Sequence, residues 1–381
     1  MSDMTKPLPR TAKKSEALSG LARVPGDKSI SHRALILGAL TVGETRVEGL
    51  LESSDIFNTS KAMQSFGAEV KKNNDESWSI FGVGVGGLCE PNSIIDCGNS
   101  GTGIRLIMGA MATSPITATF TGDESLVKRP MDRILEPLKR FGAQALSRSD
   151  GFLPLTVRGA LNPISIDYSS KIPSAQIKSA VLLAALNAPG TSVFYESEIS
   201  RDHTEKMLSA FGADVSIDKT QKGNKISIVG YPELKPQNII VPQDPSSAAF
   251  PICAALIVRG SKVTFENICQ NPTRNGLLIT LMEMGANIQI ENSRLLNGEV
   301  VADLTVSASE MRGVDVPVER VVTMIDEYPI LAVVAALATG VTTMRGIGEL
   351  RVKESDRIRA IAAGLKANGT EVEEGNDCLS I

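Results

Sequence analysis

Positively charged and hydroxyl-bearing residues stand where an apolar helix is expected to begin. The turn at residues 25–27 is followed by Lys28, Ser29 and Arg33, and residues 33–40 are almost entirely apolar. The free N–H groups and the dipole at a helix N-terminus favour a negatively charged group. This stretch therefore predicts a binding site for a phosphate or a carboxylate.

A second candidate site follows a strand that is expected at residues 93–96. The loop at 98–103 reads Gly-Asn-Ser-Gly-Thr-Gly and precedes another apolar helix. No Gly-Lys-Ser/Thr closes it as in a nucleotide-binding P-loop, and it is not the Gly-x-Gly-x-x-Gly of dinucleotide-binding folds. Its backbone N–H groups can still bind an oxyanion, while a flexible glycine-rich turn is the competing interpretation.

Polar residues also precede three further apolar helices. Ser174 and Gln176 can each donate to and accept from a polyol or a phosphate, although Ser174 taken alone is more typical of a helix N-cap. Capping accounts for Asp244, so no ligand is assigned to it. Asp326 and Glu327 enter an apolar stretch, where buried carboxylates cost free energy unless they are paired or used. A simple first-turn role in the helix dipole is the alternative for one of these two.

Basic residues recur in the loops before the second helices, at Arg129 and Arg201. Lys353 and Arg357 are predicted to lie four residues apart on one helical face, where like charges repel unless an anion sits between them. The alternative is a solvated charge run in which Glu354 is one of the partners. The two histidines, His32 and His203, do not stand in the pattern of a catalytic triad, so packing or capping is expected for both.

Composition narrows the class of protein. The chain has 381 residues, of which 42% are hydrophobic and 22% charged, as in a soluble globular protein of two domains. A net charge of −4 argues against a nucleic-acid partner. The five cysteines are scattered without a C-x-x-C pair, so neither a disulfide framework nor a zinc site is indicated. The longest apolar run is too short to span a bilayer, and we predict a cytoplasmic protein.

One unit repeats five times along the chain. Glycines that end a helix recur at intervals of 70 to 84 residues, at Gly67, Gly142, Gly212, Gly285 and Gly369. Each unit begins with a helix that is apolar nearly all round, at residues 33–40, 105–112, 179–186, 248–258 and 328–338. A helix without a polar face is buried. A strand and an amphipathic helix follow each of them.

This order predicts a two-domain α/β protein built as an inverted α/β barrel, with buried helices inside and sheets outside. A Rossmann sheet or a TIM barrel fits poorly. A linker at residues 231–236 places a boundary near residue 241. We expect a first domain at 26–241 with units one to three, and a second domain at 1–25 and 242–381 with units four and five.

Eight segments, in order along the chain, carry a resemblance to a known family. They are 26–33 (GDKSISHR), 98–105 (GNSGTGIR), 128–131 (KRPM), 174–180 (SAQIKSA), 201–207 (RDHTEKM), 244–248 (DPSSA), 326–329 (DEYP) and 350–357 (LRVKESDR). Together they resemble 5-enolpyruvylshikimate-3-phosphate synthases (3-phosphoshikimate 1-carboxyvinyltransferases) of the bacterial type called class II. The resemblance covers nearly the whole chain.

The resemblance implies a transferase of the shikimate pathway to chorismate and the aromatic amino acids. The 5-hydroxyl of shikimate 3-phosphate adds to C2 of phosphoenolpyruvate, C3 takes a proton, and phosphate leaves from a tetrahedral intermediate. It also implies a monomer whose two domains close on the substrates, no metal or organic cofactor, and inhibition by glyphosate at the phosphoenolpyruvate site.

Site residues follow from the matched motifs. Those implied to bind shikimate 3-phosphate are Lys28, Ser29, Arg33, Ser174, Ala175, Gln176, Arg201, Asp326 and Lys353. Those implied to bind phosphoenolpyruvate are Lys28, Gly101, Arg129, Gln176 and Arg357. Asp326 is expected to receive the proton of the 5-hydroxyl, Glu354 to protonate C3, and Lys28 to bridge the substrates and pass a proton.

Two other functions stay open at this point. A UDP-N-acetylglucosamine enolpyruvyl transferase usually carries a reactive cysteine in the loop that here reads Gly-Asp-Glu-Ser-Leu-Val-Lys-Arg-Pro, at 122–130. A non-catalytic anion-binding scaffold would share the cations without needing Asp326 and Glu354.

The family pattern includes a sixth unit, with an Asp-His-Arg and a later Lys that help to bind phosphoenolpyruvate. The sequence ends at Ile381, soon after the fifth unit. We therefore expect faces of the helices at 248–258 and 328–338 to be exposed.

Overall fold

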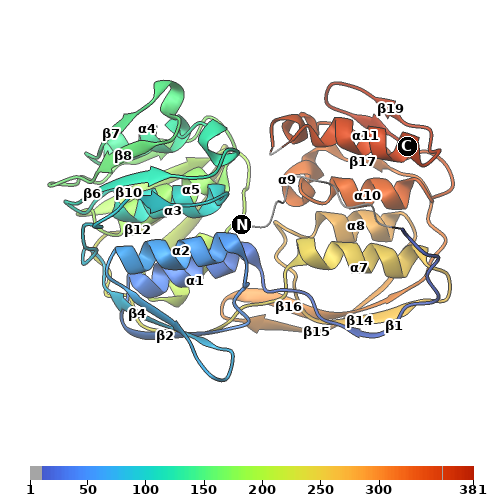
Figure 1. Cartoon of the computed structure of the whole chain (residues 1–381), viewed down its shortest axis with the longest axis horizontal. Coiled ribbons are helices and arrows are strands. Elements are labelled where there is room, and N and C mark those ends of the chain that lie inside the picture. The colour runs from blue at the N-terminus through green and yellow to red at the C-terminus, as the bar shows by residue number, and fades with distance from the viewer. Residues whose placement is uncertain (1–10, 354) are drawn as a thin grey trace.

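A computed structural model describes residues 11–353 and 355–381, so Glu354 lies outside the described residues. The helices and sheets gather into two lobes that lie side by side (Figure 1). One cluster of buried apolar residues runs from Ile30 to Val241 and another from Ala248 to Leu379. We call residues 27–241 the first lobe, and residues 19–22 with 244–381 the second lobe. The domain boundaries placed near residues 25 and 241 stay a prediction.

The five predicted units are all present. Their first helices are α1 (Lys28–Ala39), α3 (Gly101–Met111), α5 (Ala175–Ala185), α7 (Pro245–Ile257) and α10 (Tyr328–Ala335). Their second helices are α2 (Ser54–Ser65), α4 (Asp132–Arg140), α6 (His203–Ala210), α8 (Gly276–Glu283) and α11 (Arg357–Ala367). A short helix, α9 (Val321–Met324), precedes α10.

Each unit also has a four-stranded sheet with one repeated pattern, in which a parallel pair is followed by two antiparallel neighbours. In the first sheet of the first lobe the strand order is β13 (Asn238–Ile240), β2 (Val42–Glu48), β4 (Trp78–Val83), β3 (Glu69–Lys72). In the second sheet it is β5 (Ile95–Asp96), β6 (Thr117–Thr121), β8 (Leu155–Arg158), β7 (Gln144–Ser147). In the third sheet it is β9 (Asp167–Ser169), β10 (Thr191–Glu196), β12 (Gly223–Val229), β11 (Val215–Thr220). In the second lobe they are β1 (Ser19–Ala22), β14 (Lys262–Cys269), β16 (Glu299–Ser307), β15 (Asn287–Leu296); and β17 (Asp315–Val316), β18 (Thr343–Met344), β20 (Leu379–Ser380), β19 (Glu373–Glu374).

Two parallel strands come from outside the unit that they complete. β1 pairs with β14, with Ser19 opposite Lys262, and β13 pairs with β2, with Asn238 opposite Arg46. The two segments that connect the lobes therefore run past each other. Their backbones are hydrogen-bonded, from the Asp27 N–H to the Pro242 carbonyl at 2.8 Å. The crossing leads directly into α1 on one side and α7 on the other.

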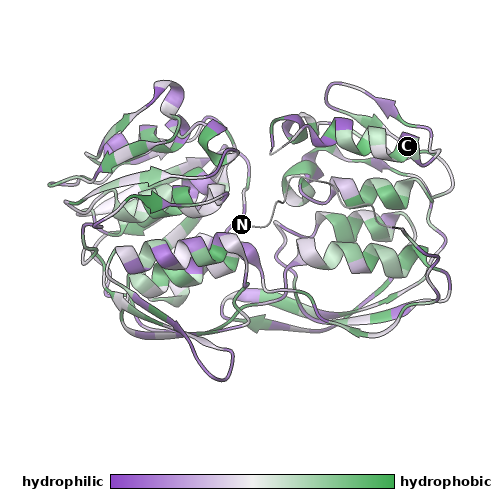
Figure 2. Cartoon of the chain, viewed as in Figure 1, coloured by the Kyte–Doolittle hydropathy of each residue, from purple (hydrophilic) through white to green (hydrophobic). Residues whose placement is uncertain are grey.

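The first helices are buried, as their sequences predict. In α1 every residue from Ile30 to Ala39 is buried, and α3 and α5 are buried over nearly their whole length. Hydrophobic residues gather on the inner helices, and polar residues are frequent on α2 (Figure 2). The helices lie inside and the sheets outside, so the expected inverted α/β architecture is confirmed.

Some large apolar side chains of the second lobe face solvent. Phe250 on α7 is 61% exposed and Leu337, just after α10, is 65% exposed. These lie on the helices for which the sequence predicts exposed faces. Within residues 11–353 and 355–381, no helix has both the length and the apolar character that crossing a membrane requires.

Candidate functional site

A carboxylate of the second lobe is held by two arginines. Asp326 lies between α9 and α10, and its Oδ2 accepts a hydrogen bond of 2.9 Å from Nη2 of Arg201, in the loop before α6 of the first lobe. Its Oδ1 accepts from Nη1 of Arg357, the first residue of α11, at 3.4 Å. The sequence predicted all three as site residues, and the structure brings them together across the two lobes.

The charges around Asp326 set its protonation state. Burial alone would raise the pKa of this carboxyl, but Arg201, Lys353 and Arg357 outweigh it and lower the pKa to about 2. Asp326 is therefore ionised at neutral pH. In this arrangement it is a strong hydrogen-bond acceptor and a weak base.

Lys353 does not share a helical face with Arg357, so that prediction is wrong. Lys353 follows a 3-10 turn at Gly348–Val352 and has an extended backbone. α11 begins only at Arg357, because the Asp356 side chain accepts the Arg359 N–H at 3.0 Å and caps the helix there. Nζ of Lys353 lies 3.4 Å from Oε1 of Glu349.

The start of α3 forms a second cluster. The Ser100 side chain caps the helix by accepting the Gly103 N–H at 3.0 Å. The Gly101 carbonyl accepts from Nη1 of Arg105 at 2.8 Å. A Cβ added at Gly101 would lie 2.8 Å from Nη1 of Arg129, so this guanidinium lies directly against the glycine. The glycine lets the backbone and the guanidinium approach each other closely.

Positive charge is concentrated beside this helix start. Burial, together with Arg133 and Arg129, lowers the pKa of Arg105 to about 9. Burial and Arg129 also lower the pKa of Arg133, and Glu349 of the second lobe partly offsets this lowering. A group of guanidiniums at a helix N-terminus is suited to bind an anion. Arg129 was predicted as a site residue from the sequence, whereas Arg105 and Arg133 were not. A charged residue at the start of the apolar stretch at 105–112 was the available signal for Arg105.

α5 begins next to α3. Ser174 caps α5 by accepting the Ile177 N–H at 3.4 Å, and Ala175 is the first helical residue. The Gln176 amide donates to the Thr102 hydroxyl at 3.1 Å. The capping interpretation of Ser174 is thus confirmed, and Gln176 joins the cluster at the start of α3.

Lys28 and Ser29 open α1, and their helix is capped by Asp27, which accepts the Ile30 N–H at 2.9 Å. Nζ of Lys28 pairs with Oδ2 of Asp55 on α2 at 3.1 Å, and the lysine side chain is 54% exposed. Lys28 therefore stands at the lobe surface with an exposed ammonium that is paired with Asp55.

Arg33 is placed differently from Lys28, because its side chain is buried. Nε donates to the Thr204 hydroxyl at 2.7 Å, Nη2 to the Ser179 hydroxyl at 2.6 Å, and Nη1 to the Ser29 carbonyl at 2.9 Å. Burial lowers its pKa to about 10, which keeps the guanidinium charged at neutral pH. In this structure Arg33 ties α1 to α5 and α6.

Both histidines are buried, as expected. Nδ1 of His32 lies 2.9 Å from the Thr59 hydroxyl, and burial with nearby Lys28 and Arg33 lowers its pKa to about 3, so the ring is neutral. Nδ1 of His203 lies 2.6 Å from Oε1 of Glu299.

Asp202, His203 and Glu299 hold possible metal-ligand atoms within 4.8 Å of one another. Nζ of Lys206 lies 3.2 Å from both carboxylates. This ammonium already supplies the positive charge that a metal ion would bring.

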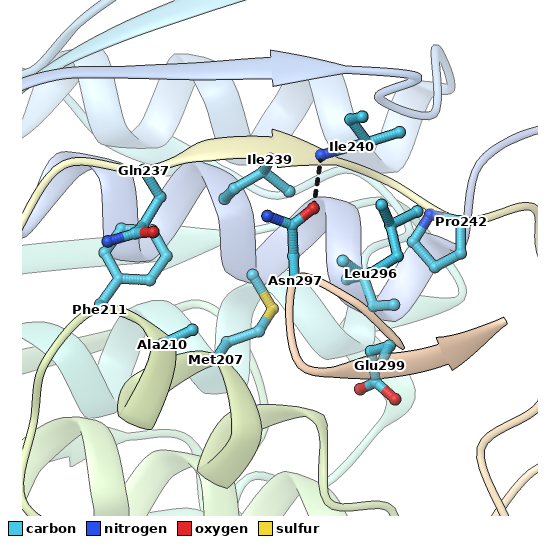
Figure 3. Close-up of a pocket in the computed structure, with 11 residues that line it drawn as sticks. Met207, Ala210, Phe211, Gln237, Ile239, Ile240, Pro242, Leu296, Asn297 and Glu299 are labelled. Atoms are coloured by element: carbon cyan, nitrogen blue, oxygen red, sulfur yellow. Dashed lines mark hydrogen bonds between the residues drawn. The ribbon is translucent and has the colours of Figure 1, made fainter. Parts of the chain in front are cut away.

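A separate, small pocket lies at the junction of the lobes (Figure 3). It is lined by Met207 of α6, by Phe211 directly after that helix, by Ile239 of β13, and by Leu296 and Asn297 of the β15–β16 hairpin, among others. The Asn297 side chain accepts the Ile240 N–H at 3.0 Å. None of the predicted site residues that the structure describes lines this pocket.

Known proteins resemble this chain over most of its length. A profile of the EPSP synthase (3-phosphoshikimate 1-carboxyvinyltransferase) family matches residues 12–381. A 3-phosphoshikimate 1-carboxyvinyltransferase of Ruegeria sp. (strain TM1040) is 59% identical over 382 residues, which covers 100% of this chain and 85% of that protein. The protein of the same name from Paracoccus denitrificans is 57% identical over 381 residues, 100% of this chain and 86% of that protein.

Solved structures agree with these relatives. An EPSP synthase from Acinetobacter baumannii superposes with a TM-score of 0.88 at 42% identity, covering 97% of this chain and 82% of that one. The enolpyruvyl transferase NikO from Streptomyces tendae gives a TM-score of 0.71 at 16% identity, over 96% of this chain and 82% of that one, and shares the fold. By its sequence and by its fold, this chain belongs to the EPSP synthase (3-phosphoshikimate 1-carboxyvinyltransferase) family.

Proposed function

We propose how the described residues divide the work of the reaction that belongs to this family. The chain is a 3-phosphoshikimate 1-carboxyvinyltransferase of the shikimate pathway. It moves the enolpyruvyl group of phosphoenolpyruvate to the 5-hydroxyl of shikimate 3-phosphate and releases phosphate. The main support for these assigned roles is the position of the Asp326 carboxylate, which lies between Arg201 and Arg357 where the two lobes are in contact.

Shikimate 3-phosphate binds mainly to the helix starts of the first lobe in this proposal. The residues assigned to it are Lys28, Ser29, Arg33, Ser174, Ala175, Gln176, Arg201, Asp326 and Lys353. The exposed ammonium of Lys28 and the guanidinium of Arg201 supply charge for the phosphate and the carboxylate. Arg33 acts through the position of Ser29, whose carbonyl it holds.

Phosphoenolpyruvate binds at the start of α3, between Gly101, Arg129, Gln176, Lys28 and Arg357. The helix N-terminus and the guanidiniums beside Gly101 suit a ligand that carries both a phosphate and a carboxylate. Arg357 approaches from the second lobe, so the ligand is enclosed only when the lobes meet.

The arginines that hold Asp326 are also those assigned to the two substrates. When anionic substrates arrive, they compete with Asp326 for Arg201 and Arg357. Losing these partners raises the pKa of Asp326, because two of the three cations that oppose the effect of burial are then engaged by the substrates. Asp326 thereby becomes a better base toward the 5-hydroxyl only when both substrates are bound.

Proton delivery to C3 is assigned to Glu354, with Lys28 as the residue that bridges the substrates. Glu354 lies outside the described residues, so this assignment rests on the sequence motif at 350–357. A positioned general acid contributes roughly a hundred- to ten-thousand-fold in rate.

Phosphate release on mixing the two substrates tests the proposal. Asp326→Asn should lose at least about a hundredfold in kcat, since the carboxylate that receives the proton is removed. Asp315→Asn is the matched control, because Asp315 is 73% exposed and pairs only with Arg345 among the described partners. Equal kcat in the two variants would remove Asp326 from the mechanism.

The loop at residues 122–130, where a UDP-N-acetylglucosamine enolpyruvyl transferase usually carries its reactive cysteine, contains no cysteine in this chain. The buried thiols of Cys97, Cys253 and Cys269 have their pKa raised to about 12 by burial, which makes them poor nucleophiles. Phosphate release with UDP-N-acetylglucosamine in place of shikimate 3-phosphate should be at background.

The remaining features belong to the same proposal. The protein works as a cytoplasmic monomer on small-molecule substrates, without a nucleic-acid partner and without a metal or organic cofactor. Turnover should persist after exhaustive treatment with a chelator, and the native mass should equal that of one chain. Loss of turnover that added metal restores would contradict the cofactor assignment.

A further inference from the structure

Arg274 lies in the loop before α8 and is buried where the two lobes meet, with 5% of its surface exposed. Its Nη1 donates to Oδ2 of Asp27 at 3.0 Å. Its Nη2 donates to Oδ1 of Asp244 at 2.9 Å and to the Ser246 hydroxyl at 2.8 Å. One guanidinium therefore holds the first lobe and the second lobe at once.

The two carboxylates that Arg274 joins are helix caps. Asp27 caps α1 by accepting the Ile30 N–H at 2.9 Å, and Asp244 caps α7 by accepting the Ser247 N–H at 2.9 Å. Arg274 consequently fixes the starting point of the first buried helix in each lobe relative to the other. The backbone hydrogen bonds between the crossing segments support the same arrangement.

Each end of this network touches a residue next to the proposed chemistry. Lys28 directly follows Asp27. In the second lobe the Ser246 hydroxyl donates to the Glu327 carboxylate, and Glu327 directly follows Asp326. The path from Lys28 to Asp326 thus passes through Arg274 and Ser246.

Stability alone does not explain so many buried charges. Asp27 is 0%, Asp244 8% and Glu327 3% exposed. Well-packed apolar residues of similar volume commonly give equal or greater stability than buried ion pairs. The buried charges instead define the geometry of the network, because a planar guanidinium fixes the distance and angle of each carboxylate that it binds.

We propose that Arg274 is a positioning residue that holds Lys28 and Asp326 in a fixed relation across the two lobes. The proposal rests on the proposed function, since it takes its importance from the roles of those two residues. Arg274 itself is not among the residues assigned to either substrate.

Arg274→Lys tests it, with Arg320→Lys as the matched control. Arg320 also binds carboxylate oxygens through both of its Nη atoms, but both bonds go to Glu283, at 2.5 and 2.7 Å, and both residues lie in the second lobe. A misplacement of about 1 Å can cost a hundredfold in rate. Arg274→Lys should lower kcat by about ten- to a hundredfold while the KM for shikimate 3-phosphate changes by less than about threefold. Arg320→Lys should keep the parent kcat.

A milder pair keeps the test valid if Arg274→Lys does not fold. Ser246→Ala breaks the link from Arg274 to Glu327, whereas Ser247→Ala removes only a hydroxyl that donates to Asp244 at 2.8 Å. Ser246→Ala should lower kcat by about three- to tenfold more than Ser247→Ala, a loss expected for a small misplacement. Parent kcat in both Arg274→Lys and Ser246→Ala, or equal losses in the two serine variants, would overturn the proposal.

Interlobe distance gives a readout that does not depend on turnover. Spin labels at Leu146→Cys and Val341→Cys, which are 79% and 65% exposed and lie in different lobes, report it after Cys89 and Cys378 are replaced by Ser. Arg274→Lys should broaden the distance distribution of the ligand-free chain, and Arg320→Lys should not. If the parent chain shows no turnover, the proposed function fails, and this comparison alone decides the role of Arg274: an unchanged distribution overturns it.

Discussion

Nη2 of Arg201 donates a hydrogen bond of 2.9 Å to Oδ2 of Asp326, although the two residues belong to different lobes and are 125 positions apart in the chain. The pair joins a residue assigned to shikimate 3-phosphate with the proposed base. In this structure Arg201 is therefore paired with a carboxylate of the protein itself. In the proposed mechanism, substrate binding exchanges one anionic partner of Arg201 for another.

Removing Arg201 should raise the pKa of Asp326. In the parent chain this pKa is about 2, below the ordinary value of 3.8, because Arg201, Lys353 and Arg357 outweigh burial. Arg201→Ala removes the largest of the charges that oppose the effect of burial, so the pKa of Asp326 should rise. Carboxyl carbon chemical shifts followed from about pH 2 to pH 7 check this.

The lowered pKa of Asp326 also predicts how the stability of the fold depends on pH. A carboxyl with a lowered pKa stabilises the fold above its unfolded value and loses that effect as the pH falls through its folded value. The parent should therefore be more stable than Arg201→Ala above about pH 4, and the difference should vanish below about pH 2. Arg345→Ala is the control, since Arg345 pairs with exposed Asp315 within one lobe. A pH-independent difference for Arg201→Ala would show that its effect is not electrostatic.

Arg201→Ala should also weaken the binding of shikimate 3-phosphate. The lost charge-assisted hydrogen bond is worth about 1.5 to 3 kcal/mol, which corresponds to a rise in Kd of roughly ten- to a hundredfold. Part of this loss is offset, because the parent arginine must leave Asp326 before it binds the ligand. Calorimetric titration of shikimate 3-phosphate measures the Kd, and the parent value in Arg201→Ala would remove this residue from the site.

Gly101→Ala should weaken inhibition by glyphosate more than it weakens the binding of phosphoenolpyruvate. The added Cβ would lie 2.8 Å from Nη1 of Arg129 and 2.9 Å from Nη1 of Arg105. Both atoms are ends of flexible side chains, so they can shift, and the space beside the helix start becomes smaller. Glyphosate is longer than phosphoenolpyruvate and should suffer more from this loss.

Steady-state inhibition compares the two proteins. The inhibition constant of Gly101→Ala should rise by at least about tenfold, equivalent to 1.4 kcal/mol, with a smaller rise in the KM for phosphoenolpyruvate. Gly364→Ala on α11 is the control, because nothing lies within 4 Å of its added Cβ. Equal inhibition constants would refute the steric account.

Lys178→Met should destabilise the first lobe strongly. The Lys178 ammonium is fully buried and lies 2.9 Å from Glu196 and 2.7 Å from Glu205, which are also buried. Removing the cation leaves two buried carboxylates without it, a loss of about 3 to 5 kcal/mol. Urea unfolding should show this loss, and Lys71→Met, which breaks an exposed pair with Glu69, should change stability by less than about 1 kcal/mol.

A charge-neutral variant separates electrostatics from packing. Adding Glu196→Gln and Glu205→Gln to Lys178→Met should recover much of the lost stability, because no unpaired charge is left buried. Failure of the triple variant to recover any stability would mean that the cost comes from the shape of the side chains.

Much of the fold could be predicted from the sequence because the relevant signals are local. The spacing of helix-ending glycines and the all-apolar helices gave five units, and the burial of α1, α3 and α5 follows from their lack of a polar face. Helix capping was equally local, as at Ser174 and Asp244, each of which bonds an N–H three residues ahead.

Partner choice between distant elements could not be predicted in this way. Asp27 and Asp244 each stand before an apolar helix, where helix capping is the local role that the sequence indicates. Their shared partner Arg274 is 247 positions from Asp27, so no local signal points to it. A period in the sequence reports which side of an element is buried and not which other element covers it. The pairing of β1 with β14 and of β13 with β2 is of the same kind.

The error at Lys353 has a related cause. A charge spacing of four residues fits a helix, yet the Asp356 cap starts α11 after Lys353. The sequence by itself determined the units, their buried helices, their caps and the family motifs, because each depends on neighbours a few residues away. Only the tertiary structure decided that Arg201 meets Asp326, that Arg33 is buried and that Arg274 joins the lobes, because those contacts depend on how separate units are placed in space.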